Sequence, residues 1–365
     1  AGDNPTNLVN EYLANDATCA SVDTELTLLW QDLTTGENGG ANDSKSDGAV
    51  QNPFWKSLTT IGTTSQANNQ VQKSYTLNAS GPTWVPFGAV GAAPRLSPGD
   101  LYLVSRLDAD IAAVVRDAID RAADIMYDTV NHSIMLDESA SNGLADAAAN
   151  SELDNSNGAF PALRDGDDYE LTRNETQADL RFGAAYVQYN ALSGGDQFFV
   201  GPRVTWFPGD GLPLNRTLDL VATYGANHSG VPRATDGVPR RTNYADGYLY
   251  TNGSIINSVE SYNARDFGGL GQLEFATQQQ IAGFLAAGGT FGVGNVWEPL
   301  ADTVPDNRYL VANFIRGNLS WAEAAWSAIP GLSWQQLAVG DPLARSHRSS
   351  EDINADVRST IDDLY

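Results

Sequence analysis

The stretch that decides the fold runs from Gly253 to Arg345, near the end of the printed chain. It begins with the apolar run Ser254-Ile255-Ile256-Asn257-Ser258-Val259 and continues to a glycine-rich bend, Gly268-Gly269-Leu270-Gly271. A helical apolar pattern follows, and then two loop signals, Val296-Trp297-Glu298-Pro299 and Val339-Gly340-Asp341-Pro342-Leu343. An apolar strand, a glycine turn and an amphipathic helix in this order are typical of an α/β domain, in which ligands bind where the strands end.

The same alternation of strands and helices continues upstream of this block. Short apolar runs predict strands over 101–104, 184–189, 198–200, 204–207 and 218–224. Helices are expected after Asp108 as N-cap, over about 272–287 before Gly288-Gly289, and after the capping box Ser320-Trp321-Ala322-Glu323. We therefore expect one α/β domain over 1–365, with a doubly wound, largely parallel sheet and loop-rich excursions at 34–80 and 137–170.

The charge of the chain limits its partners. The net charge is −24, and it comes from 33 Asp and 12 Glu against 18 Arg and three Lys. Such a surface repels phosphate backbones, so a nucleic-acid partner is not expected. An Asp-rich, Lys-poor chain fits a saline or calcium-containing exterior, and the plain alternative is an acidic soluble protein.

No apolar run is long enough to cross a membrane, so membrane insertion is not expected. The polar start Ala1-Gly2-Asp3 suits a mature terminus exposed by cleavage, which favours a secreted, extracellular or cell-surface location.

Cysteine and histidine restrict the chemistry further. The single cysteine, Cys19, excludes an internal disulfide and a cysteine-based zinc site. The three histidines, His132, His228 and His347, are not spaced as ligands of one metal ion. An acidic segment offers oxygen ligands for Ca²⁺ at Asp154, Asp165, Asp167 and Asp168, although a solvated acidic loop would have the same composition.

The chain resembles an uncharacterised family of secreted bacterial proteins through several segments in the same order. These segments are 20–26, 101–108, 258–262, 268–269, 284–290, 292–299, 321–326 and 340–345. That family is in turn distantly similar to gingipain-like and caspase-like cysteine peptidases, which implies a doubly wound sheet with a His at the end of one strand and a Cys at the end of the next. The resemblance also implies strands before residue 21, so the sheet is expected to lack its first strands. An open sheet edge can pair with another chain, so the expected partners are a second copy or a processed upstream fragment.

The resemblance gives candidate positions for the site. His228 follows the strand predicted at 218–224, where the family's His is expected, and Ser258 and Ser261 stand where its Cys is expected. A serine hydroxyl needs an aligned base and an oxyanion hole, so this replacement predicts a non-catalytic protein. The alternative is a hydrolase that uses His228 with Ser258 or Ser261.

Three carboxylates, Glu260, Glu298 and Asp341, are candidates for the strand-end crevice. In the hydrolase alternative Glu298 would assist the reaction. The structural alternative for Glu298 is a bond to backbone N–H groups, and for Asp341 it is the capping of a turn.

Overall fold

A computed structural model describes part of the chain, and every structural statement below concerns that part. The described residues are 50–52, 54–58, 73–78, 81–86, 103–137, 168–190, 199–200, 202, 212–223, 244–258, 263–264, 267, 280–295, 304–332 and 336–348.

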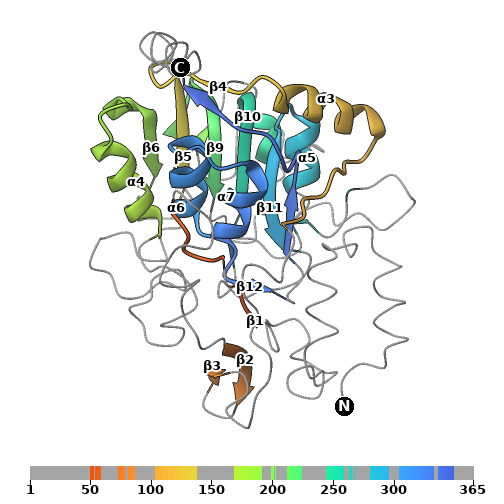
Figure 1. Cartoon of the computed structure of the whole chain (residues 1–365). Helices are drawn as coiled ribbons and strands as arrows, with labels where there is room; N and C mark the ends of the chain where they lie inside the picture. Colours follow the sequence, from red (N-terminus) through yellow and green to blue (C-terminus); the bar gives the residue numbers. More distant parts are fainter. Residues whose placement is uncertain are drawn as a thin grey trace, which may run out of the picture.

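The centre of the fold is a mixed, mostly parallel sheet of six strands with helices around it (Figure 1). Its strands, in spatial order, are β13 (Gln336–Val339), β11 (Phe291–Asn295), β10 (Leu249–Ser258), β9 (Thr217–Thr223), β5 (His132–Asp137) and β6 (Val187–Asn190). All neighbours pair in parallel except β13, which runs antiparallel to β11. The strand order reverses between β5 and β9, which is the switch point of a doubly wound sheet.

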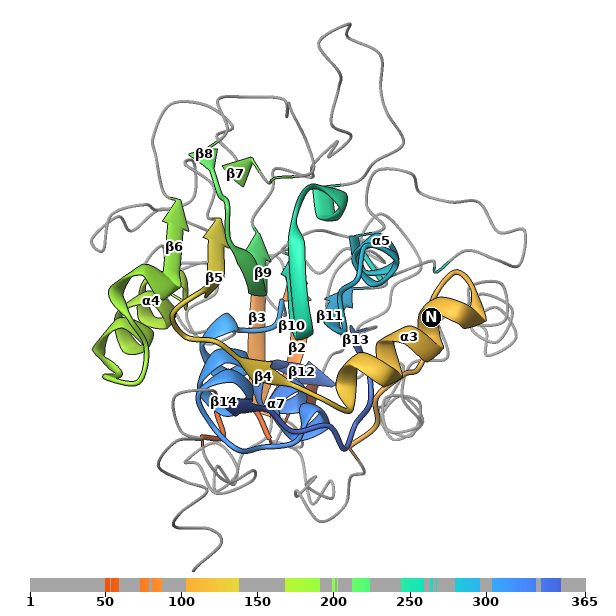
Figure 2. The same ribbon diagram turned by 90° about the horizontal axis from the view of Figure 1, so that it is seen from above.

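Both faces of this sheet are covered by helices. Neighbouring residues of each strand point to opposite faces, so each strand contributes to two separate buried clusters. Ile134, Leu220 and Ile255 belong to one buried cluster, whereas Met135, Val221 and Ile256, each the next residue of its strand, belong to another. The first cluster packs against α4 (Asp168–Ala178), the 3₁₀ turn η4 (Ala184–Tyr186), α6 (Asn307–Leu310), the π-helical turn η6 (Val311–Ile315) and α7 (Trp321–Ala328). The second packs against α3 (Ala112–Ala122), η5 (Tyr244–Gly247) and α5 (Gln280–Ala286). Figure 2 shows α7 and α5 on opposite sides of the strands.

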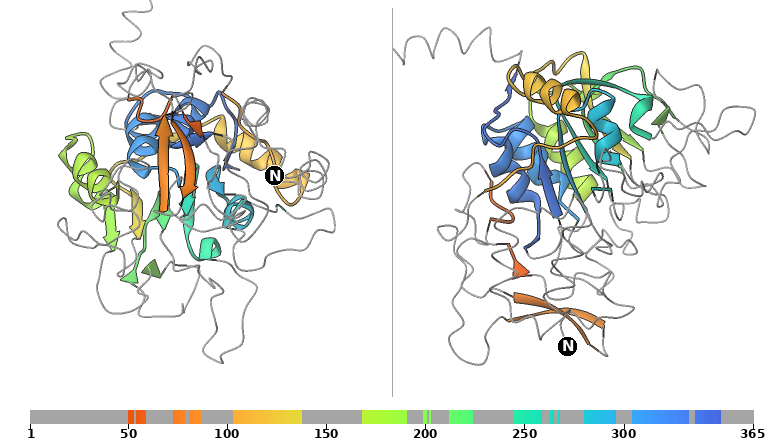
Figure 3. Two further views of the ribbon diagram at one scale, coloured as in Figure 1. Left: turned by 90° about the horizontal axis from the view of Figure 1, so that it is seen from below. Right: turned by 90° about the vertical axis from the view of Figure 1, so that its right-hand side faces the viewer.

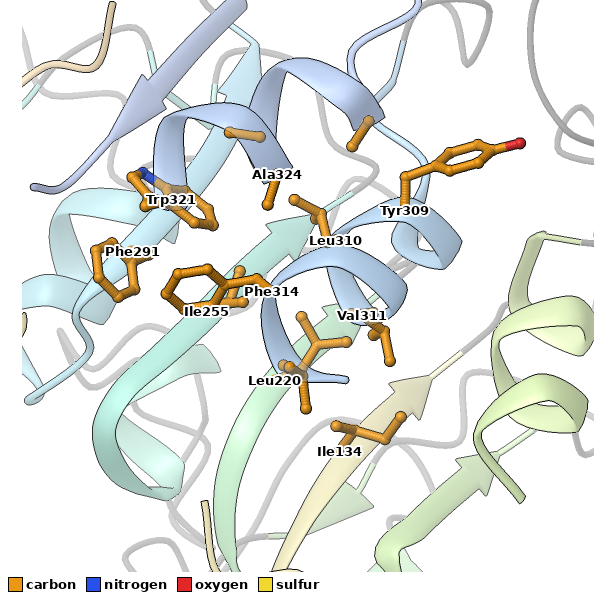
Figure 4. Close-up of a cluster of buried hydrophobic side chains, with 14 of the residues drawn as sticks. Ile134, Leu220, Ile255, Phe291, Tyr309, Leu310, Val311, Phe314, Trp321 and Ala324 are labelled. Atoms are coloured by element: carbon orange, nitrogen blue, oxygen red, sulfur yellow. The ribbon is translucent and has the colours of Figure 1, made fainter. Parts of the chain in front are cut away.

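Aromatic rings fill the first face (Figure 4). Phe291 of β11 stacks on Trp321 of α7 with ring centroids 4.7 Å apart, and Phe314 of η6 contacts both rings edge-on. Trp321 and Phe314 are fully buried. This packing holds α7 and η6 on the sheet.

A second, four-stranded sheet lies beyond α7 (Figures 1 and 3). It joins β12 (Gly331–Leu332), β1 (Val50–Gln51), β2 (Lys73–Asn78) and β3 (Gly81–Pro86), all antiparallel. After β1, Asn52 and Trp55 form hydrogen bonds with residues at the end of α7 and just before α6. Asn52 donates to the carbonyls of Trp326 and Ile329, and the Trp55 indole donates to Asp306 Oδ2 at 2.6 Å. The excursion expected at 34–80 therefore contains β1, β2 and a buried anchor.

Two pairs of short strands complete the described part of the fold. β4 (Met126–Tyr127) pairs in parallel with β14 (His347–Arg348) at the opposite end of the sheet from β12 (Figure 1). β7 (Phe199–Val200) pairs in parallel with β8 (Leu212–Pro213). Within the described residues, no helix is long and apolar enough to cross a bilayer.

Two expectations about the start of α3 are wrong. The predicted strand over 101–104 is absent from its described part: residues 103–105 are irregular, and Arg106 makes a single bridge to Val339 of β13. The predicted N-cap, Asp108, lies before the helix, which begins at Ala112 after Ile111. The Asp108 carboxylate instead accepts the N–H of Ala109 and pairs with Arg106 at 2.7 Å. Asp108 thus takes part in an ion pair within the loop, and the Arg106 backbone and the Ser105 hydroxyl hold the loop against β13 and Gly340.

Candidate functional site

The carboxyl ends of three neighbouring parallel strands carry a row of polar residues. Asp137 of β5 pairs with Thr223 of β9, and Thr223 pairs with Ser258 of β10. By strand alternation all three point to the face covered by α3 and α5, and all three are buried. The row spans the switch point between β5 and β9, where doubly wound proteins bind ligands, so it defines the candidate site.

The two strand ends that would carry the peptidase-like pair are neighbours. β9 ends at Thr223 and β10 at Ser258, close to the ends predicted from sequence. His228 follows five residues after Thr223, and Ser261 three after Ser258, but both lie outside the described residues. The strands therefore deliver their following loops to the same edge of the sheet.

Ser258 itself is sealed. Its side chain is fully buried, and its backbone carbonyl accepts the Asn263 side-chain N–H at 2.8 Å. A nucleophile must reach a substrate, and a fully buried hydroxyl cannot do so without opening the fold. This burial counts against Ser258 as the nucleophile of the hydrolase alternative.

Thr223 is different from its neighbours because its hydroxyl has no hydrogen-bond partner. The residue is fully buried at the end of β9. A buried hydroxyl without a partner costs about 1–3 kcal/mol. The geometry therefore places an unsatisfied polar atom in the middle of the row.

Side-chain amides also support the strand ends. Asn257 of β10 donates to the Pro305 carbonyl at 2.7 Å and to Asn307 Oδ1 at 2.8 Å. Asn263 Oδ1 accepts the N–H of Asn295 at 2.6 Å, and Gln336 donates to Asn295 Oδ1 at 3.2 Å. Amides are neutral and do not transfer protons near neutral pH, so this layer can position backbone but cannot act as acid or base.

Asp168, a calcium candidate from the sequence, caps a helix. The residue is buried, and its Oδ2 accepts the N–H of Asn307 at 3.0 Å and the Asn307 side-chain N–H at 2.8 Å. Its Oδ1 accepts the N–H of Arg308 at 2.9 Å. These bonds satisfy the first turn of α6 from a distant part of the chain, as an N-cap would.

The other calcium candidates, Asp154, Asp165 and Asp167, lie outside the described residues. Within the part that the structure describes, no group of three His, Cys, Asp or Glu side chains is arranged to hold a metal ion. The only support for bound calcium is therefore the acidic composition of the sequence around these residues.

Asp341 does not lie at the strand-end crevice. It follows β13, and β13 runs antiparallel, so Asp341 is at the amino end of the parallel strands. Its Oδ1 accepts the N–H of Leu343 at 2.9 Å, which caps the turn before Ala344. The structural alternative for Asp341 is therefore correct. Glu260 and Glu298 lie outside the described residues.

A second polar cluster, not expected from the sequence, lies at the amino end of the sheet. Asp219 of β9 is fully buried, and it accepts hydrogen bonds from the Tyr186 hydroxyl at 2.7 Å and the Thr251 hydroxyl at 2.8 Å. His132 Nδ1 lies 3.1 Å from its Oδ1. The available signal was a charged residue inside the apolar run Leu218-Asp219-Leu220-Val221, because a buried carboxylate requires partners.

The pKa values of Asp219, His132 and the nearby Tyr127 are all shifted upward. Burial raises the pKa of Asp219, and the bonds from His132, Tyr186 and Thr251 only partly oppose it. Burial also opposes the charge on His132, but the hydrogen bond and charge of Asp219, with Asp128, outweigh burial and raise the pKa of His132. Burial and the nearby Asp219 charge raise the pKa of Tyr127, so this phenol stays neutral. The pair thus holds a proton more strongly than a free histidine.

Comparison with protein-family models, with curated protein sequences and with solved structures finds no match to this chain. The family resemblance described above therefore remains a prediction from the sequence.

Proposed function

We propose that this chain is a secreted, non-catalytic member of a caspase-like and gingipain-like group of α/β proteins, and that it works by binding or self-association. The observation that carries the proposal is the end of β10. A cysteine is expected there, but the chain has its single cysteine at position 19, and the strand ends instead in the fully buried Ser258. The doubly wound strand order and the neighbouring ends of β9 and β10 support the assignment to this group.

The chemistry of the described strand ends also favours a non-catalytic role. The side-chain amides of Asn257 and Asn263 bind backbone groups there, and these amides cannot exchange protons near neutral pH. The Asp168 carboxylate is used to cap α6. Among the described residues at the strand ends, these amides and Asp168 therefore position backbone, and Asp137 is the one carboxylate of the row formed with Thr223 and Ser258.

The test is reaction with a fluorophosphonate probe, which labels activated serines, read by intact-protein mass. The proposal predicts no adduct on the full chain. The variants S261A and H228A, with S258A as matched control, identify any labelled site. An adduct that survives S258A but disappears in both S261A and H228A would establish the hydrolase.

The hydrolase remains the second candidate for one reason. Because β9 and β10 are adjacent and parallel, the loops that carry His228 and Ser261 leave the same edge of the sheet. In that case the working nucleophile is Ser261, since Ser258 is sealed.

Self-association would use an edge strand, and the described edges differ in their suitability. The outer side of β13 is occupied, because Arg106 N–H donates to the Ala338 carbonyl and Gly340 N–H donates to the Arg106 carbonyl. In β3 the hairpin register directs the backbone groups of Pro82, Trp84 and Pro86 away from β2, toward the open edge. Two of these three residues are prolines and have no N–H to donate to an added strand. The described edge strands of the large sheet are β13 and β6, and among the described residues β6 has neither a paired strand nor a bridging residue on its outer side.

We therefore assign self-association to β6, by pairing with the same strand of a second copy. The test is sedimentation velocity over a concentration series. Gln188→Lys places a charge on β6, and Gln177→Lys adds the same charge on the exposed surface of α4 as a matched control. The proposal predicts that Q188K raises the dissociation constant by about tenfold and Q177K does not. A chain that stays monomeric at every concentration contradicts the assembly role.

A further inference from the structure

His132 presents one ring nitrogen to two incompatible partners. The backbone N–H of Asp128 points at His132 Nδ1 across 3.1 Å, so it donates only when Nδ1 carries no proton. Asp219 Oδ1 lies 3.1 Å from the same Nδ1, and this contact requires a proton between the two atoms. The two contacts cannot be satisfied together, so the protonation state decides which one forms.

The position of Asp219 explains why this choice matters. The register of β9 shifts on both sides of Asp219: between Ser133 and Ile134 toward β5, and between Tyr250 and Ile255 toward β10. Asp219 therefore lies at a break in the ladder, and side chains from three elements contact its carboxylate. His132 is the only one of its three donors that can lose a proton near neutral pH.

His132 also ends a tight turn. The Asp128 carboxylate accepts the N–H groups of Val130 and Asn131, and His132 N–H donates to the Asp128 carbonyl at 2.8 Å. This turn joins β4 to β5. The Arg216 guanidinium donates to the carbonyls of Val130 and His132, so a fixed positive charge faces the ring as well.

We propose that His132 and Asp219 form a proton-linked latch that fastens the β4–β5 turn to the amino end of the sheet. In the closed state the imidazolium donates Nδ1–H to Asp219. When His132 loses that proton to solvent, Nδ1 becomes an acceptor for the Asp128 N–H, and Asp219 keeps only Tyr186 and Thr251 as donors.

The charges around the ring agree with this assignment. Asp219 and Asp128 raise the pKa of His132, whereas burial and Arg216 lower it, and the net shift is upward. A group with a raised folded pKa stabilises the fold below its unfolded value of about 6.5 and loses this contribution as pH rises through the folded value. The latch is therefore closed in mildly acidic solution and opens as pH rises through the raised pKa of His132.

The experiment is a side-chain and backbone nitrogen NMR titration of the full chain from about pH 5 to about pH 9. The latch predicts that His132 Nδ1 loses its proton with a midpoint above about 6.5, and that the Asp128 amide shifts with the same midpoint. D219N should lower the His132 midpoint. H132Q should abolish the titration of the Asp128 amide in this range. H347Q, which removes a different and exposed histidine, should leave the Asp128 titration as in wild type.

Several results would overturn the latch. One is a His132 that keeps Nδ1–H at high pH, because Nδ1 then never accepts from Asp128. Another is an Asp128 amide that titrates in H132Q as it does in wild type. The wild-type titration decides the matter even if D219N fails to fold, since a midpoint at or below about 6.5 removes the role of Asp219.

Discussion

Replacing Asp168 tests whether its carboxylate caps α6 or binds calcium. Asp168→Asn keeps the shape of the side chain but exchanges one acceptor oxygen for an NH₂ donor. In the better orientation the amide oxygen keeps both bonds from Asn307, and the NH₂ group then faces the N–H of Arg308. The charge-assisted bond from the Arg308 N–H is lost, and this N–H then faces the new NH₂ group, which is also a donor. We expect the free energy of unfolding to fall by about 2–3 kcal/mol. Asp168→Ala removes all three bonds in a buried site and should cost about 3–5 kcal/mol.

The assay is urea unfolding followed by tryptophan fluorescence, with and without added Ca²⁺ and with EDTA. We expect D168N to lower the free energy of unfolding by the same amount in all three solutions, because the carboxylate binds N–H groups. The control is Asp341→Ala, which removes one bond in a partly exposed turn and should cost about 0.5–1 kcal/mol. The capping role is refuted if D168N is as stable as wild type. It is also refuted if the loss appears only when Ca²⁺ is present.

Three further substitutions test the packing of the fold. At Gly340, φ is +127° and an added Cβ would lie 2.2 Å from the Phe291 ring, whereas at Gly288 φ is +109° with no atom within 4 Å. Both Gly→Ala changes strain the backbone by about 1–3 kcal/mol, and G340A should cost a further 1–3 kcal/mol or so from overpacking; equal melting temperatures for the two variants would contradict this. Trp55→Phe loses the indole bond to the buried Asp306 and should lower the free energy of unfolding by about 2 kcal/mol, with increased proteolysis near residue 55. Unchanged cleavage in W55F would show that this anchor is not needed to hold the segment.

The sequence predicted the sheet well where apolar runs are continuous. The carboxyl ends of β9 and β10 lie within one residue of the predicted ends, because buried parallel strands are marked by β-branched and aliphatic runs. The amino end of β10 differs, since the strand begins at Leu249 and the apolar run only at Ser254. The capping box at Ser320 and Glu323 is also confirmed, since this motif depends only on local geometry.

The remaining features depend on contacts between distant segments. Asp168 caps α6 across 139 positions of sequence, and Trp55 reaches Asp306 across 251. No local pattern indicates such partners. Asp108 was mispredicted as an N-cap because Arg106 pairs with it in the folded chain. Asp219 was overlooked because its apolar neighbours dominated the strand pattern.

The most direct test of the central claim is the distance between the His228 ring and the hydroxyl oxygens of Ser258 and Ser261 in a crystal structure of the full chain. A non-catalytic protein predicts that both distances exceed about 8 Å, or that packing seals the hydroxyl away from solvent. A His228 nitrogen within about 3.5 Å of the Ser261 hydroxyl, at the mouth of an open pocket, would contradict the account and favour the hydrolase.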